Sequence, residues 1–79
     1  MLVVKDKGIL LQIIKRCNRV TEKVSNVSET EFSLNDDIKE VVCFNLFQIG
    51  ELANGLSIEF IKEYNKIPWK QIIGMRNRI

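Results

Sequence analysis

The apolar residues in the first third of the chain recur at steps of three and four positions. This spacing places them on one face of an α-helix, with charged residues on the other face. We therefore predict an amphipathic helix from about Lys5 to Val27, long enough to be a full member of a helical bundle. Its apolar face comprises Leu10, Ile13, Ile14, Cys17, Val20, Val24 and Val27. Its charged face comprises Lys15, Arg16, Arg19, Glu22 and Lys23.

A polar stretch at positions 25–35 follows, and we expect it to be a connector with a short helical turn. A second helix is predicted to begin at positions 33–35, because Ser33 followed by Asp36 resembles a capping box. Its apolar face comprises Ile38, Val41, Val42, Leu46, Ile49, Leu52, Ala53 and Leu56.

Two aromatic residues of the second helix indicate that it is covered on two sides. Phe44 and Phe47 fall partly outside its apolar face, and we predict them as core residues, with a dimer interface as the alternative. Gly50 lies in the middle of the helix, which costs about 1 kcal/mol relative to alanine. Such a glycine is usually tolerated where another backbone comes close.

The remainder of the chain predicts two further helical segments. Ser57 is placed to cap a short segment from Ile58 to Tyr64. A final helix is predicted to begin with Pro68 as its first residue. The sequence then continues to Ile79 without a residue that would end this helix, so we expect the bundle to be incomplete at its C-terminal end.

These segments predict an all-α fold with one domain over residues 1–79. A domain of this size buries only about 60% of the surface of its unfolded chain, so its stability is marginal and oligomerisation is expected. Trp69 and Met75 are expected in the core or in a dimer contact. Cys17 and Cys43 are too few for a disulfide framework and are predicted as packed thiols.

Composition excludes several classes of protein and site. The chain has no histidine, which excludes the common Cys/His zinc sites, and we expect neither a metal nor a cofactor. No apolar run approaches the roughly 20 residues needed to cross a bilayer. No signal peptide is visible, so a cytoplasmic protein without a membrane contact is expected.

The small net charge of +2 is unevenly distributed along the chain. Residues 1–61 carry seven Lys/Arg against nine Asp/Glu, a balance of −2, whereas residues 62–79 carry five against one, a balance of +4. The basic C-terminal end is suited to phosphate, and a solvated helix face is the alternative.

Two stretches in the second half resemble a known family. Positions 45–53 read NLFQIGELA, and positions 67–79 read IPWKQIIGMRNRI. They resemble the HepT-like proteins of the HEPN superfamily, which carry an IGE helix and an IPW…RN segment followed by a His and a Tyr. The resemblance extends from about Asp6 to the end of the chain. It implies a HEPN-like up-and-down helical bundle.

The resemblance also implies a function and its partners. HepT-like proteins are toxins of type II toxin–antitoxin pairs and act as homodimeric, metal-independent endoribonucleases on RNA. Their partner is an MNT-type nucleotidyltransferase antitoxin. Two other functions stay open, namely a non-catalytic nucleotide- or substrate-binding accessory subunit of a nucleotidyltransferase, and a remnant that only dimerises.

Five residues are candidates for the site that this resemblance implies. Arg76 matches the arginine of the family motif, and Asn77 matches the polar residue after it, so both are predicted to be catalytic. Arg78 and Lys70 are expected to bind RNA phosphates together with Arg76. Glu51 is a candidate for lining the cleft, and pairing with a surface lysine is the alternative.

The chemistry of RNA cleavage explains why the family motif needs an arginine and a histidine. Attack of a ribose 2′-OH on the adjacent phosphate needs a proton carrier that titrates near neutrality, which is the usual role of histidine. It also needs a fixed positive charge on the phosphorane, which the planar fork of Arg76 suits. The expected histidine lies two residues past Ile79, so the 79 residues alone are expected to be inactive. An Arg76 buried in an apolar interior, or held by a carboxylate away from any groove, would contradict this interpretation.

Overall fold

The chain folds into a small all-α bundle, as the sequence predicts. The computed structural model describes residues 3–77, and within this range it contains five α-helices, a 3-10 helix and no strand. In chain order the elements are α1 (Val4–Val24), α2 (Glu29–Leu34), α3 (Asp36–Asn54), α4 (Ile58–Glu63), α5 (Trp69–Gly74) and η1 (Met75–Asn77).

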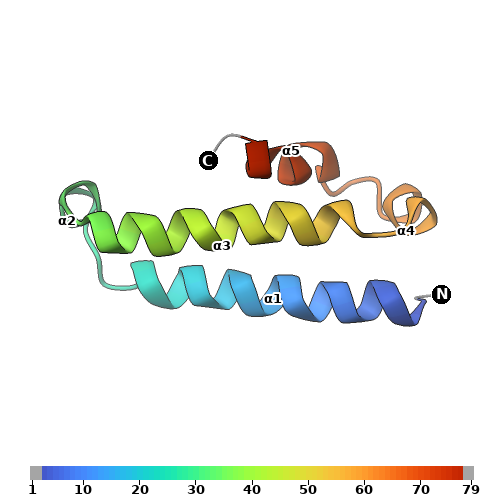
Figure 1. Ribbon diagram of the computed structural model, residues 1–79, viewed down its shortest axis with the longest axis horizontal. Coiled ribbons are helices and arrows are strands. Elements are labelled where there is room, and N and C mark those ends of the chain that lie inside the picture. Colours follow the sequence, from blue (N-terminus) through green and yellow to red (C-terminus); the bar gives the residue numbers. More distant parts are fainter. Residues whose placement is uncertain (1–2, 78–79) are drawn as a thin grey trace.

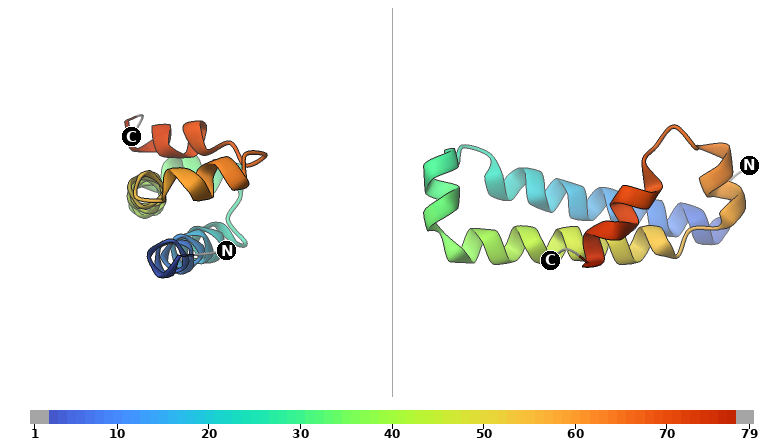
Figure 2. Two further views of the ribbon diagram at one scale, coloured as in Figure 1. Left: turned by 90° about the vertical axis from the view of Figure 1, so that its right-hand side faces the viewer. Right: turned by 90° about the horizontal axis from the view of Figure 1, so that it is seen from above.

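The two long helices form the frame of the molecule. α1 and α3 lie antiparallel along its length, and α2 forms the corner between them (Figure 1). α5 lies on the opposite side of α3 from α1, so α3 is the middle helix. α5 crosses α3 obliquely (Figure 2). The described part of the chain is therefore elongated, with extents of 43 × 21 × 18 Å.

The helix boundaries differ from the predicted ones where a local hydrogen bond decides them. α3 begins after Asn35, whose side-chain oxygen accepts a hydrogen bond from the backbone N–H of Ile38 at 3.0 Å. The predicted capping box is wrong, because Ser33 lies inside α2. α1 ends at Val24, short of the predicted end, and Asn26 then turns the chain in the left-handed conformation that asparagine tolerates (φ 65°).

The last helix is shorter than the sequence suggests. Pro68 is the residue before α5 and not its first residue. α5 ends at Gly74, and the backbone N–H of Met75 donates to the carbonyl of Ile72, a tighter i to i−3 bond. The chain then continues as the 3-10 turn η1, which is common at the ends of α-helices. Arg76 therefore lies in a 3-10 turn.

The core is concentrated where α3, α4 and α5 meet. Its buried residues are Ala53, Leu56, Phe60 and Trp69, and partly buried isoleucines of α1 and α5 pack against them. Trp69 is a core residue, as predicted, and its indole N–H donates to the carbonyl of Tyr64 at 3.0 Å. The rings of Phe60 and Trp69 meet edge to face, with their centroids 5.7 Å apart.

A buried carboxylate joins the start of α1 to the start of α4. Asp6 is only 2% exposed and accepts hydrogen bonds from the backbone N–H of Ser57 at 2.9 Å and from its hydroxyl at 2.6 Å. The Ser57 hydroxyl oxygen in turn accepts from the backbone N–H of Phe60 at 3.1 Å, which confirms the predicted cap of this helix. The hydrogen bonds from the Ser57 side chain and backbone lower the pKa of Asp6 below its ordinary value.

Several residues that were predicted to be buried lie at the surface. Cys17 and Cys43 are exposed, so the prediction of packed thiols is wrong. Phe44 and Phe47 are 54% and 37% exposed, so they are not core residues of this chain. Ile14 is also 54% exposed, because α1 packs against α3 through one face only. In the described part of the chain, no helix combines the length and apolar character needed to cross a membrane.

Candidate functional site

The 3-10 turn that carries Arg76 passes directly over a glycine of α3. A Cβ atom built on Gly50 would lie 3.0 Å from the backbone nitrogen of Arg76 and 3.1 Å from the carbonyl oxygen of Ile72. These distances are shorter than an ordinary van der Waals contact, so only a hydrogen atom fits without a shift of the backbone. The close approach that the sequence predicted at Gly50 is confirmed, and the backbone that approaches is that of α5 and η1.

The partly exposed side chain of Arg76 pairs with α3. Its Nη1 atom donates to the Glu51 carboxylate at 3.2 Å, and the two side chains are 32% and 47% exposed. Glu51 therefore pairs with Arg76 and not with a surface lysine. Arg76 is thus held by a carboxylate, and it does not line any of the hollows described below. The contact engages one of the five N–H donors of the guanidinium group, whose fork geometry suits a phosphate.

Two of the other candidate residues, Asn77 and Lys70, lie in the described part of the chain. Asn77 is exposed at the end of η1, next to Arg76 in the chain. Lys70 is exposed in the first turn of α5, six positions before Arg76. Arg78 lies outside the described residues. The structure thus brings Glu51 and Arg76 together. Asn77 is near them because it follows Arg76 in the sequence.

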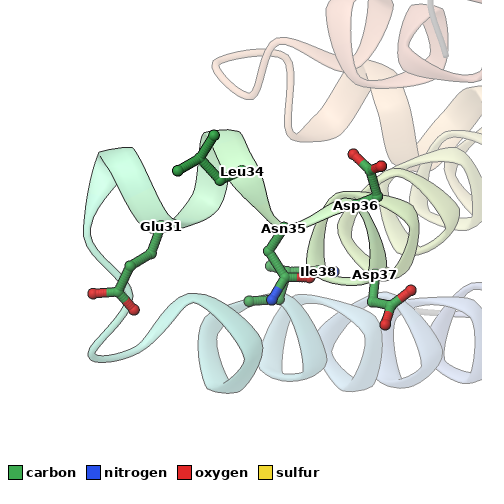
Figure 3. Close-up of a pocket in the computed structure, with 6 residues that line it drawn as sticks. All are labelled: Glu31, Leu34, Asn35, Asp36, Asp37 and Ile38. Carbon is green, nitrogen blue, oxygen red and sulfur yellow. Dashed lines mark hydrogen bonds between the residues drawn. The ribbon is translucent and has the colours of Figure 1, made fainter.

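A hollow at the far corner of the molecule has the wrong charge for a phosphate. It has a volume of about 460 Å³ and lies where α2 meets α3 (Figure 3). It is lined by Glu31, Leu34, Asn35, Asp36, Asp37 and Ile38. Three of these side chains are carboxylates, which repel an anion. This hollow is therefore not suited to bind the phosphate that Arg76 would contact.

Sequence reasoning missed a buried polar group between the two long helices. Asn45 is 2% exposed, and its amide N–H donates to the carbonyl of Val41 at 2.7 Å. Its side-chain oxygen accepts a hydrogen bond from Arg16 Nη1 at 3.3 Å, and the guanidinium carbon of Arg16 lies 5.5 Å from the centre of the Phe44 ring. A signal was present, because Asn45 lies at a four-residue step between Val41 and Ile49 on the predicted apolar face.

Comparison with known proteins identifies the family. Residues 10–79 match the family described as "Ribonuclease HepT-like". The chain belongs to the HepT-like family. It is 31% identical over 70 residues to a protein of Caldanaerobacter subterraneus subsp. tengcongensis named "Putative RNase TTE0752", covering 89% of this chain and 62% of that protein. It is also 31% identical over 71 residues to "Putative RNase MJ1380" of Methanocaldococcus jannaschii, covering 90% and 65%.

This HepT-like chain thus spans just under two thirds of the length of these relatives. No solved structure matches it. The two stretches that carry the family resemblance are adjacent in space, because positions 45–53 lie in the C-terminal half of α3, and positions 69–77, which form α5 and η1, pack against this helix. Among residues 3–77, no group of three or more histidine, cysteine, aspartate or glutamate side chains is arranged to bind a metal ion.

Proposed function

We propose that this HepT-like chain is the RNA-cleaving subunit of a type II toxin–antitoxin pair, a metal-independent endoribonuclease in which Arg76 stabilises the reacting phosphate. One observation carries the proposal. The two segments typical of the family meet where Arg76 passes over Gly50 and pairs with Glu51. The Arg76 side chain is 32% exposed and uses one N–H donor for Glu51, so its guanidinium group has further donors that suit phosphate oxygens.

In the proposed reaction, the 2′-oxygen of a ribose attacks the adjacent phosphorus while its proton passes to a base. The bond from phosphorus to the 5′-oxygen breaks, and the 5′-oxygen receives a proton, leaving a 2′,3′-cyclic phosphate. Arg76 donates hydrogen bonds to the non-bridging oxygens as negative charge develops on the phosphorane. In this proposal Glu51 orients the guanidinium group and Asn77 contacts the same phosphate.

The proton transfers need a group that the 79 residues do not contain, because they include no histidine. The proposal therefore concerns a protein in which a histidine follows the Arg76 segment, as the family resemblance implies. An arginine and a histidine within about one helical turn can project to the same side of a helix.

The proposed active form is a homodimer in which the Arg76 segments of two chains face each other. The exposed side chains of Ile58, Tyr64 and Ile67, in a chain whose own core is small, support such an assembly. An MNT-type nucleotidyltransferase is the proposed antitoxin partner. The HepT-like match supports this pairing.

The proposal is tested by cleavage of a labelled RNA with the full-length protein, with and without a chelator. We expect cleavage that a chelator does not affect, with products that end in a 2′,3′-cyclic phosphate. Arg76→Gln should lower kcat/KM by about 100-fold or more, because it removes the positive charge from the transition state. Arg76→Lys should retain part of the activity, since it keeps the charge but loses the planar fork.

The matched control is Lys66→Gln, which removes one positive charge from an exposed position before α5. It should leave cleavage near the wild-type rate. Cleavage that disappears with a chelator would contradict the metal-independent mechanism. A folded wild-type protein that binds nucleotides but cuts no RNA would favour the accessory subunit of a nucleotidyltransferase.

A further inference from the structure

We propose that the groove between α1 and α3 beside Phe44 binds a single-stranded segment of the RNA, at a surface separate from the Arg76 site. This inference rests on the proposed function, since it assumes that RNA is the substrate. The α1–α3 groove has a volume of about 410 Å³. Its side chains relevant here are Arg16, Arg19, Asp37, Glu40, Phe44 and Asn45.

The α1 wall of the groove is basic. Arg16 and Arg19 line it, and two adjoining hollows of about 260 and 230 Å³ continue along α1 and share Arg19. These hollows add Lys15 on one side and Lys23, together with Glu22, on the other. The four-residue steps between positions 15, 19 and 23 place three cations in one row, about 6 Å apart along the helix axis. Such a row can follow the phosphates of a single strand.

The α3 wall of the groove offers an aromatic surface. Phe44 is 54% exposed, and the Arg16 guanidinium lies 5.5 Å from its ring centre. The buried Asn45 holds Arg16 through its side-chain oxygen, so this guanidinium is oriented before any ligand arrives. Proteins that bind single strands combine basic grooves with aromatic rings or arginine planes on which bases stack.

The charges of the groove are divided between its walls. The cations that line it come from α1, whereas the carboxylates Asp37 and Glu40 come from α3. A nucleotide would turn its phosphate to α1 and its base to α3, where carboxylates accept hydrogen bonds from base amines. The apolar face of a second copy fits less well, because it would bury these charged groups without partners.

The test measures the affinity of the full-length protein for a short single-stranded RNA with 2′-O-methyl groups, which cannot be cleaved. Fluorescence anisotropy is recorded over a range of salt concentrations. Phe44→Leu and Arg16→Gln should each weaken binding about tenfold, as expected for one stacked base or one arginine contact. Arg16→Gln should also reduce the slope of log affinity against log salt by about 0.7.

Two matched variants test whether the effect is local. Phe47→Leu removes an exposed ring of α3 that does not line the groove, and Lys62→Gln removes an exposed charge on α4. Both should bind RNA like the wild type, and circular dichroism should show the same helix content for all variants.

The possible failures separate this inference from the proposed function. If the wild type binds and cleaves RNA while Arg16→Gln and Phe44→Leu bind it unchanged, the groove inference is overturned and the proposed function stands. If the same variants alter only the sedimentation of a dimer, the groove is a protein interface and the inference is also overturned. If the wild type neither binds nor cleaves RNA, both fail.

Discussion

The backbone of Arg76 passes directly over Gly50, so that a Cβ on the glycine would lie 3.0 Å from the Arg76 nitrogen and 3.2 Å from the Arg76 Cβ. The position of the candidate catalytic arginine therefore depends on the absence of a side chain in the middle of α3. Glu51, the next residue of that helix, holds the guanidinium group of the same arginine. Two consecutive residues of α3 thus place the backbone and the side chain of Arg76.

Gly50→Ala should destabilise the protein and displace η1. The added methyl group meets backbone atoms that cannot rotate away, and overpacking of this kind costs about 1–3 kcal/mol. This cost exceeds the gain of about 1 kcal/mol that alanine brings to a helix interior. Urea denaturation gives the stability, and RNA cleavage should fall as well. Gly8→Ala is the control, because nothing lies within 4 Å of its added atom, and it should stabilise the protein. Equal stabilisation by both variants would contradict the close contact.

Glu51→Ala should lower cleavage about tenfold with little effect on stability. The carboxylate pairs with Arg76 at the surface, and such pairs contribute at most about 1 kcal/mol to folding. In the proposed mechanism Glu51 orients the guanidinium group, and a small loss of orientation reduces the rate of a reaction strongly. Glu51→Gln keeps an oxygen that can accept the hydrogen bond and should retain more activity. The effect should appear in kcat and not in KM. Faster cleavage by Glu51→Ala would mean that the pair competes with phosphate.

Asp6 should make the free energy of unfolding depend on pH in the acidic range. Its pKa in the folded state is lowered from the ordinary 3.8 by the hydrogen bonds from Ser57, so the unfolded chain binds its proton more readily. The stabilisation is complete above about pH 4 and is lost as the pH falls through the lower folded pKa. Asp6→Asn should be less stable than the wild type at neutral pH, and the difference should narrow in acid. A constant difference at all pH values would refute this origin. Glu22→Gln, at an exposed position of α1, is the control.

Ser57→Ala should destabilise the start of α4. The Ser57 hydroxyl caps this helix and donates to Asp6, so its loss removes a cap worth about 1 kcal/mol and leaves the buried carboxylate with one partner fewer. Thermal unfolding followed by circular dichroism measures the loss. Ser28→Ala removes the analogous cap of α2. In the described structure no carboxylate is hydrogen-bonded to this hydroxyl, so the loss of stability should be smaller. An equal loss in both variants would show that the contact with Asp6 adds nothing.

Trp69→Phe should destabilise the core because it removes one hydrogen bond. The phenylalanine keeps most of the ring contact with Phe60 but removes the indole donor to the Tyr64 carbonyl. This carbonyl still accepts from the backbone N–H of Ile67 at 3.2 Å, so the loss should be about 0.5–1.5 kcal/mol. Trp69→Leu should cost more, since it also removes aromatic packing. Urea denaturation monitored by circular dichroism compares the two. If Trp69→Phe is as stable as the wild type, water replaces the donor.

The predictions from the sequence succeeded where the information was local. Three- and four-residue periodicity predicted α1 and α3, and the Ser57 cap follows from a hydroxyl at the start of a helix. They failed where burial depends on distant neighbours. Cys17 belongs to the predicted apolar face of the first helix and Phe44 was predicted as a core residue, yet both are exposed in the described structure. Conversely, Asp6 and Asn45 are buried, and each accepts a hydrogen bond from a residue far along the chain, Ser57 and Arg16 respectively.

The sequence by itself determined that this chain is helical, that Gly50 faces another backbone and that residues 67–79 resemble a segment typical of the HepT-like proteins. Only the tertiary structure decided that the backbone over Gly50 belongs to Arg76, that Glu51 holds this arginine and that Arg16 lies beside Phe44. The reason is physical. Helix periodicity and caps arise from neighbours within one or two turns, whereas these contacts exist only after α1, α3 and α5 have packed together.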